Sequence, residues 1–366
     1  HIKNSNIKKS LKNYYDNLLF MSIIKVAIAQ IAPDYMNKEG TINRACKAIE
    51  DAAKQGAKLI VFPEAFIPGY PYWRGILPIS KWTEMMVEYY KNSVNVKTDL
   101  ESIKDISRER EISIVLGISE KDPREGSRSL YNSLVFINEK GKITNVHRKV
   151  MPTHGERMIW KMGDGTTLRI SSLSGIRVGG LVCYENHMNI IKAVLQSMGE
   201  EIHIAVWPGY WVQEGHPGAK RRFDPSKDEI SKCDIDSAIR EYAFEAQAFV
   251  VSANMYMPSD LIAEYQFDIA AGGSSVVNPA GLYIVKPQIN EEKIIVAEIS
   301  TDEILAVKAY FDSLGHYTRW DIASILYRAK ERKPIERKAL GLRDETIDIG
   351  FEKFEKLIKR LKLKDK

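Results

Sequence analysis

Short apolar runs alternate with amphipathic helical patterns along most of this chain, and this order restricts the fold more than any other feature. Strands are predicted over residues 25–30, 58–63, 112–119, 131–138, 143–148, 167–171, 178–182, 203–207, 249–254, 274–278 and 294–299. Helical patterns lie between them, over residues 41–55, 79–93, 100–111, 188–198, 235–247 and 301–310. Alternating units of this kind predict an α/β fold whose strands are buried on both faces.

A single domain is predicted for most of the 366 residues, because no Gly-, Ser- or Pro-rich linker interrupts the alternation. Residues 1–20 are rich in Lys, Asn and Ile, and we interpret them as a disordered extension, a cloning remnant or a misassigned start. Met21 is then the native first residue, and the domain covers residues 21–325. Residues 326–366 are predicted to form a partly helical C-terminal extension that makes oligomer contacts.

The composition argues against several classes of partner. The chain has 53 Lys and Arg against 48 Asp and Glu, and the net charge of +5 is spread along its length. Because no basic stripe with interleaved aromatic residues occurs, nucleic acid is not expected as a partner. No apolar run approaches the ~20 residues that a membrane span needs, so no membrane association is expected either.

The three cysteines, Cys46, Cys183 and Cys233, lack the spacing of a disulfide framework. A low, odd count is typical of a reducing compartment, so we predict a cytoplasmic protein. Cys46 lies in a helical pattern and is expected in the core, whereas Cys233 lies in a charged segment and is given no role. No residues have the spacing of a metal site, and neither a metal nor a cofactor is predicted.

Cys183 ends an apolar run, and polar residues follow it at once. This pattern predicts a buried strand that ends in a thiol, a turn over residues 184–186 and a helix from about His187. Helix N-terminal N–H groups favour a thiolate, and the N–H just after the thiol can bind an oxyanion. The alternative is a buried structural cysteine, which is the commoner role of an unpaired Cys.

Two other strand ends carry charged residues of the kind that a reactive thiol needs. The run over residues 58–62 ends in Pro63-Glu64, and a strand should stop there because proline cannot donate to a sheet ladder. The run over residues 143–148 ends in a basic cluster that includes Lys149. Each of these two is more often a solvated residue when it is seen alone. Active sites of α/β sheets lie at the carboxyl ends of strands, so Glu64, Lys149 and Cys183 together predict one joint site.

These residues resemble the nitrilase superfamily of carbon–nitrogen hydrolases, and the resemblance extends over residues 24–321. Its anchors are Phe62-Pro63-Glu64, His147-Arg148-Lys149 and residues 182–186. Segments 62–73, 152–157, 163–165 and 311–319 resemble the nitrilase branch rather than the amidase branches. Two positions depart from the common nitrilase pattern, since Tyr184 stands where Trp is usual and Trp320 where Pro is usual. The resemblance implies a four-layer α-β-β-α sandwich in a single domain.

The resemblance also implies a role for each site residue. Cys183 attacks the carbon of an organic nitrile, and a thioimidate and then a thioester form on it. Glu64 acts first as general base and then as general acid, while Lys149 stabilises developing charge. Glu156 matches a second family glutamate that holds Lys149 and orients the substrate, and its alternative is an ordinary surface role. The backbone N–H of Tyr184 completes the oxyanion site. The products are a carboxylic acid and ammonia, and no cofactor takes part.

Aromatic residues near the predicted strand ends are candidates for the wall of a substrate pocket. They are Tyr70, Tyr72, Trp73, Trp207, Tyr210 and Trp211, of which Tyr70, Trp73, Trp207 and Tyr210 are assigned to the pocket. Such a wall excludes water and shapes the space for the acyl group, although aromatic residues at this density are more often part of a core.

Several alternatives stay open. His187 follows the thiol by four residues, so a Cys-His dyad of the papain type is the alternative mechanism. His316 belongs to a family motif at the edge of the site and is expected to be structural. An amidase or a cyanide-hydrolysing member with the same Glu-Lys-Cys set is the alternative function, and a non-catalytic binding protein is the alternative class. Residues 212–225 are predicted to form an irregular loop. The resemblance implies that insertions in this region help to build contacts between dimers. We therefore predict a homodimer that can extend into a larger spiral oligomer.

Overall fold

Two six-stranded sheets form the framework of the structure, a computed structural model that describes residues 23–74, 77–209, 230–258, 261 and 270–330, with only the backbone over 230–234. The first sheet has the order β12 (Lys293–Ser300), β1 (Ile23–Gln30), β2 (Leu59–Val61), β3 (Ser113–Lys121), β4 (Leu130–Ile137) and β5 (Ile143–Arg148). The second has the order β11 (Tyr283–Ile289), β10 (Gly272–Val277), β9 (Phe249–Asn254), β8 (Ile202–Trp207), β7 (Ile176–Val182) and β6 (Ser171–Leu173).

Each sheet has a parallel centre and antiparallel edges. Strands β1, β2 and β3 run parallel to one another, as do β7, β8 and β9. The strand β4 is antiparallel to both β3 and β5, so β5 points the same way as β2 and β3. The carboxyl ends of β2, β3 and β5 therefore lie at one edge of the first sheet, where the side chains of Glu64 and Lys149 are expected to meet.

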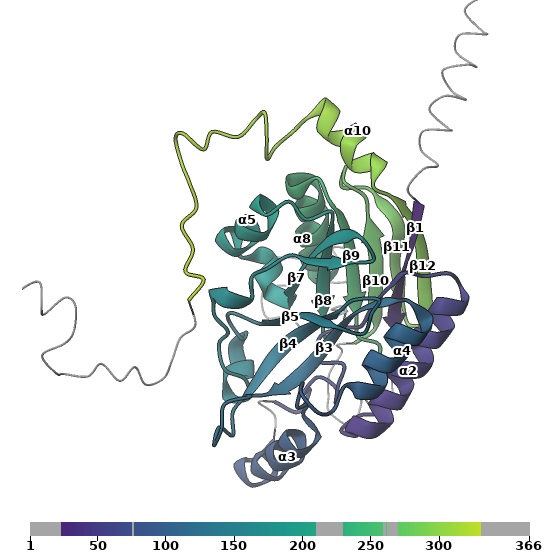
Figure 1. The fold of residues 1–366 in the computed structure, drawn as a ribbon. Coiled ribbons are helices and arrows are strands. Elements are labelled where there is room, and N and C mark those ends of the chain that lie inside the picture. The colour runs from purple at the N-terminus through teal and green to yellow at the C-terminus, as the bar shows by residue number, and fades with distance from the viewer. Residues whose placement is uncertain (1–22, 75–76, 210–229, 259–260, 262–269, 331–366) are drawn as a thin grey trace, which may run out of the picture. The chain divides into compact units, whose positions relative to one another are not determined.

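Helices cover the outer faces of both sheets. The helices α2 (Lys38–Lys54), α3 (Ile79–Asn92) and α4 (Glu101–Arg110) belong to the first sheet, and α5 (Asn189–Ser197) and α8 (Ile230–Ala246) to the second. Figure 1 shows α2 with α4 on one outer side and α5 with α8 on the other, and the two sheets between them. A further helix, α10 (Asp302–Tyr310), follows β12. The four-layer sandwich that the resemblance implies is confirmed.

Hydrophobic periodicity explains how the layers pack. The helix α2 buries Ile42, Ala45, Ile49 and Ala52, which recur at the spacing of one helical face. These side chains join the core on the outer face of the first sheet. A second core fills the space between the sheets and continues to Ile239 and Tyr242 of α8. Burial of this apolar surface is the main force that holds the layers together.

The six predicted helices are confirmed to within a few residues, but one predicted strand was wrong and one strand was not predicted. Residues 165–167 form a 3₁₀ turn, and the short β6 begins only at Ser171, so the predicted strand over 167–171 does not exist as such. Strand β11 was missed because it contains Pro287, which is tolerated there since β11 lies at the edge of its sheet. All of the described elements belong to one compact unit that ends at Ala329. Residues 1–20, and 331–366 of the predicted extension, lie outside the described residues.

Candidate active site

The structure brings three of the predicted site residues into direct contact. Nζ of Lys149, which directly follows β5, lies 3.0 Å from Oε1 of Glu64 and 2.8 Å from Oε2 of Glu156. Lys149 and Glu64 are fully buried, and Glu156 is 1% exposed. A cation in so dry a place needs anionic partners, and two carboxylates supply them. The surface alternative for Glu156 is therefore wrong, and so is the solvated alternative for Glu64 and Lys149.

Glu64 reaches this position because its loop crosses β3 closely. After β2 ends at Val61, the N–H of Phe62 still donates to the carbonyl oxygen of Val115, at 2.8 Å. The chain then leaves the ladder and passes over Gly117. A Cβ at Gly117 would lie only 1.9 Å from the carbonyl oxygen of Pro63. The lack of a side chain at Gly117 is what allows the backbone of Glu64 to lie there.

Gly117→Ala is expected to lower both activity and stability, because the added methyl group must push the backbone beside Glu64 out of place. We expect a loss of kcat of at least about tenfold and a destabilisation of about 1–3 kcal/mol, as for other overpacked sites. Turnover and thermal unfolding measure the two effects. Gly155→Ala is the matched control, since its Cβ would meet only the Arg74 side chain at 3.9 Å. Equal activity of the two variants would contradict this account of the loop.

The Glu156 carboxylate accepts hydrogen bonds from three donors. Its Oε1 accepts from the Tyr70 hydroxyl at 2.6 Å, and its Oε2 accepts from the backbone N–H of Thr153 at 2.8 Å as well as from Lys149. Burial raises the pKa of Glu156, but Lys149 and these hydrogen bonds outweigh it, so the pKa lies below its usual range. For Lys149, burial acts in the other direction and lowers the pKa, but the negative charges of Glu156 and Glu64 raise it above its ordinary value. Lys149 and Glu156 therefore form a permanent ion pair.

Glu64 has a different electrostatic character. Burial raises the pKa of Glu64 to about 7. The positive charge of Lys149 lowers this pKa, and the negative charge of Glu156 raises it. Asn132 donates to Oε1 of Glu64 at 2.6 Å, the same oxygen that Lys149 contacts. Its other oxygen, Oε2, is buried and has no hydrogen-bond partner. A carboxyl group of this kind exchanges a proton near neutral pH, which is the property of a general base.

The thiol of Cys183 lies on a strained turn. Cys183 directly follows β7 and opens a 3₁₀ helix, Cys183–His187, with φ at +52°, a region that few non-glycine residues adopt. Helix α5 begins at Asn189, two residues later than predicted. Backbone strain of this kind is often found at functional sites. It persists here because the residues that follow are firmly held.

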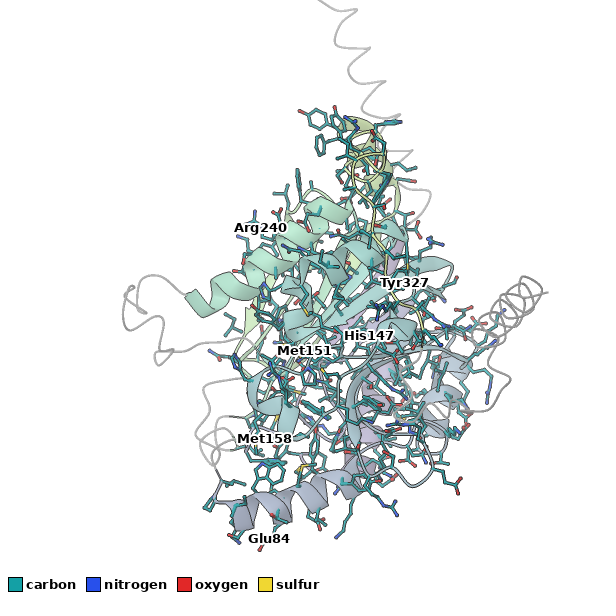
Figure 2. All side chains as sticks on the ribbon, turned by 90° about the vertical axis from the view of Figure 1, so that its left-hand side faces the viewer. Glu84, His147, Met151, Met158, Arg240 and Tyr327 are labelled. Carbon is teal, nitrogen blue, oxygen red and sulfur yellow. The ribbon has the colours of Figure 1, made fainter. Side chains whose placement is uncertain are left out.

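Glu185 holds this turn in place. Its carboxylate accepts from the backbone N–H groups of Val182 (2.8 Å) and Val150 (2.6 Å), and Nε2 of His147 lies 3.0 Å away. Burial raises the pKa of Glu185, but His147 and the two N–H donors bring it below its usual range. Val182 directly precedes Cys183, and Val150 directly follows Lys149. The Glu185 carboxylate therefore joins the backbone beside the thiol to the backbone beside the lysine. In Figure 2, His147 and Met151 mark this junction, between Glu84 of α3 and Arg240 of α8.

Burial outweighs the predicted effect of the helix N–H groups on the Cys183 thiol. Burial raises the pKa of the thiol well above its ordinary value, although Lys149 and a hydrogen bond from the Tyr184 N–H act in the opposite direction. The thiol is thus protonated near neutral pH. The negative charges of Glu64 and Glu156 also raise the pKa of the thiol.

The predicted aromatic wall is only partly assembled in the described residues. Tyr70 belongs to the site because its hydroxyl donates a hydrogen bond to Glu156. Its ring centroid lies 5.7 Å from that of Trp160. Trp73 is fully buried, and its ring lies edge-on to that of Tyr89 at 5.9 Å. We assign Trp73 to the core. Tyr210, Trp211 and the irregular loop over 212–225 lie outside the described residues.

The two histidines considered as alternatives lie in different surroundings. His187 packs between the rings of Tyr184 (5.0 Å) and Trp207 (5.9 Å). It is thus an aromatic neighbour of Trp207, which was predicted to line the pocket. His316 lies on an exposed turn, where its backbone N–H donates to Asp312 at 3.2 Å.

Asn132 and Glu185 were not singled out from the sequence as site residues. Each is a buried polar residue, Asn132 within the largely apolar β4 and Glu185 just after β7. Buried polar groups need partners, so an Asn inside an apolar strand is the signal that would have pointed to it. In the described parts of the chain, no group of three or more His, Cys, Asp and Glu side chains has the arrangement of a metal site. The same parts contain no helix long and apolar enough to span a membrane.

Comparison with known proteins agrees with this geometry. Residues 25–309 match the carbon–nitrogen hydrolase family. An aliphatic nitrilase of Rhodococcus rhodochrous is 31% identical over 87% of this chain and 83% of its own length. An arylacetonitrilase of Aspergillus niger is 30% identical over 82% of this chain and 87% of its own length. The crystal structure of a carbon–nitrogen hydrolase from Helicobacter pylori has a TM-score of 0.65 at 20% identity and covers 82% of this chain and 96% of that one. The chain therefore belongs to the carbon–nitrogen hydrolase family.

Proposed function

We propose that this protein hydrolyses an organic nitrile to the carboxylic acid and ammonia through covalent intermediates on Cys183. The observation that supports the proposal is the buried set of Lys149 between two carboxylates, which Glu185 joins to the strained turn that carries the Cys183 thiol. Relatives at about 30% identity that are named nitrilases favour a nitrile over an amide as the substrate.

In the first step, Glu64 takes the proton of the Cys183 thiol as the sulfur attacks the nitrile carbon. Burial holds the thiol protonated, and the Glu64 pKa of about 7 suits it to this transfer. The S–C bond forms, one C–N π bond breaks, and the proton passes from Glu64 to the nitrogen. The product is a thioimidate on Cys183. Lys149 and the N–H of Tyr184 stabilise the negative charge that develops on the substrate.

Two molecules of water complete the reaction. Glu64 removes a proton from the first as it adds to the thioimidate carbon, and the tetrahedral intermediate expels ammonia when its C–N bond breaks. A thioester remains. The second water adds in the same way, the C–S bond breaks, and the carboxylic acid leaves while the thiol regains its proton. Glu156 takes no proton, since its low pKa keeps it ionised, and it positions Lys149 throughout.

The test is ammonia release from matched pairs of nitriles and amides, both aliphatic and arylacetic, with the acid identified as product. We expect acid and ammonia from nitriles and little or none from the amides. Turnover of the amides alone would support the alternative of an amidase with the same Glu64, Lys149 and Cys183. Turnover of cyanide alone would support a cyanide-hydrolysing enzyme. A folded protein that released ammonia from none of these compounds would contradict the proposal.

The pH dependence should report Glu64. Because the carboxylate, and not the neutral acid, accepts the thiol proton, kcat/KM is expected to rise with pH through about 7 and to approach a plateau above it. In Glu156→Gln, one negative charge that raises the Glu64 pKa is lost, so the rising limb should move to lower pH while the maximum rate falls. Steady-state kinetics on both sides of the Glu64 pKa measure both effects. A profile that is flat through neutral pH would contradict the role of Glu64.

Self-association is the further part of the proposal. The described surface carries a row of stacked aromatic side chains, Phe244, Phe311 and Tyr317, which are 37–65% exposed. Exposed apolar groups that lie together often mark a contact between proteins. Light scattering is expected to give a dimer or a larger assembly. A monomer at every concentration would rule this out, and a dimer at every concentration would exclude the spiral form.

A further inference from the structure

Asn132 and Lys149 lie directly opposite each other on neighbouring strands. The β4–β5 register pairs Ser133 with Arg148, and the next pair is held by the Lys149 N–H, which donates to the carbonyl oxygen of Asn132 at 2.8 Å. Residues that face each other across an antiparallel pair project to the same side of the sheet. Both side chains here reach the same atom, because Asn132 Nδ2 and Lys149 Nζ lie 2.6 and 3.0 Å from Oε1 of Glu64.

The two oxygens of Glu64 are therefore unlike each other. Oε1 accepts two hydrogen bonds, whereas Oε2 is buried without a hydrogen-bond partner. Donors that already occupy one oxygen leave the other as the place where a proton is gained or lost. They also prevent the carboxyl group from rotating, since rotation would break both bonds at once.

We propose that Asn132 is a positioning residue for the reaction: it fixes Glu64 so that Oε1 is held and Oε2 is the atom that exchanges protons with the Cys183 thiol. This inference rests on the proposed function of Glu64 as the base. It adds that the base is oriented by an uncharged donor, with Lys149 acting on the same oxygen. Asn132 does not touch the reacting atoms and acts through Glu64.

The opposite face of the same strands offers a natural control. Ser133 and Arg148 also face each other, and both hold a buried carboxylate, that of Glu120. Ser133 Oγ donates to Glu120 Oε2 at 2.7 Å, and Arg148 donates to both oxygens at 2.8 and 2.7 Å. Asn132 and Ser133 are thus neighbours on one strand, both buried and both bonded to a glutamate. Of the two side chains, only that of Asn132 contacts a residue of the site.

Removal of the Asn132 donor has a predictable electrostatic consequence. Its hydrogen bond favours the ionised form of Glu64 and lowers the pKa that burial raises. Asn132→Leu keeps the size of the side chain and removes the donor. Because a hydrogen bond to the ionised form is lost, the Glu64 titration should move up by about one to two pH units.

The experiment compares wild type, Asn132→Leu, Asn132→Asp and Ser133→Ala by two measurements. The first is the pH profile of kcat/KM with a nitrile substrate. The second is the pH dependence of Cys183 alkylation by iodoacetamide, with the Cys183 peptide followed by mass spectrometry, which needs no knowledge of the substrate. Thermal unfolding identifies any variant that does not fold, and the isosteric Asn132→Asp replaces Asn132→Leu in that case. A carboxyl group beside Glu64 should also raise its titration.

In both Asn132 variants we expect the rising limb to move up by about one pH unit or more, and kcat at neutral pH to fall about tenfold or more with a smaller change in KM. Ser133→Ala should lose stability and keep the wild-type limb. The inference would be overturned if the rising limb of a folded Asn132 variant lay at the same pH as that of wild type. It would also be overturned if Ser133→Ala moved the limb as far as the Asn132 variants do. If wild type released no ammonia from nitriles, the proposed function would fail, while the alkylation profiles would still decide the role of Asn132.

Discussion

Cys183→Ala is expected to abolish turnover and to leave the fold intact. The covalent pathway has no substitute for the sulfur, and loss of a nucleophile of this kind costs about 10⁶ in kcat in other hydrolases. The side chain is 7% exposed and packs in the core between the sheets, so the loss of one sulfur atom should cost about 1 kcal/mol of stability. Ammonia release and thermal unfolding measure the two effects.

Cys46→Ala is the matched control for this result. Cys46 is also a free thiol, and it lies on α2, which packs on the outer face of the first sheet. Its replacement should leave kcat close to that of wild type. If Cys183→Ala kept an appreciable share of the wild-type rate, or if Cys46→Ala lost activity to the same degree, the assignment of Cys183 as the nucleophile would be wrong.

Lys149→Met should produce the second largest effect. The substitution keeps a long side chain and removes the charge, so little is lost in packing. Glu64 and Glu156 then face each other without a cation, and we expect one of them to hold a proton at neutral pH. A protonated Glu64 cannot act as base, and developing charge on the substrate loses its partner. We expect kcat to fall about 10³-fold or more, by analogy with other removed electrostatic stabilisers.

The same variant should show a change in stability that depends on pH. Without Lys149, both buried carboxyl groups acquire a pKa in the folded state that lies above that in the unfolded state. A group of this kind favours the folded state fully below its unfolded pKa, and this contribution is lost as the pH rises through the folded pKa. Lys149→Met should therefore be nearly as stable as wild type near pH ~4 and less stable by about 3–5 kcal/mol near pH ~8.

Lys161→Met provides the comparison for Lys149. Lys161 also pairs with a carboxylate, Asp122, at 3.1 Å, but its side chain is 37% exposed. A pair of this kind contributes at most about 1 kcal/mol, so Lys161→Met should keep its activity and most of its stability at every pH. Denaturant titrations at acidic and at alkaline pH distinguish the two. A Lys149 variant with near wild-type turnover would refute its assigned role.

The helices and most strands of the fold could be predicted from the local spacing of hydrophobic residues in the sequence. The helix α2 places Ile42, Ala45 and Ile49 at helical spacing, and burial of one face is enough to identify it. The strands β5 and β9 begin and end where their apolar runs do. Strand β11 is different, because it lies at a sheet edge, alternates only weakly and contains Pro287, which is normally a signal against a strand.

The site was partly predictable for a related reason. Glu64 and Lys149 follow strands of the first sheet that run in one direction, so their side chains are expected at the same edge, whereas Cys183 follows a strand of the second sheet. Pairings that depend on three-dimensional contact could not be predicted in this way. Asn132 lies within a strand and is identified only by its partner Glu64, and Glu185 only by the N–H groups of Val182 and Val150 that it binds.

The effect of burial on the Cys183 thiol could not be predicted from the sequence. A sequence shows that a helix follows Cys183, and helix N–H groups favour a thiolate. It does not show how completely the thiol is removed from water. In the folded protein, burial outweighs the attraction of Lys149 and raises the Cys183 pKa. We therefore expect the thiol to need a base, which is the role proposed for Glu64.

The covalent intermediate on Cys183 can be observed as a change in the mass of the Cys183 peptide during turnover of a nitrile. The reaction is quenched with acid at successive times, and the protein is digested and analysed. We expect a Cys183 peptide whose thiol hydrogen is replaced by the acyl group of the substrate, R–C(=O)–. This modified peptide should disappear when the nitrile is consumed, and the Cys46 peptide should stay unmodified throughout. Substrate bound to another residue, or ammonia release during which the Cys183 peptide keeps its free thiol at every time, would contradict this expectation.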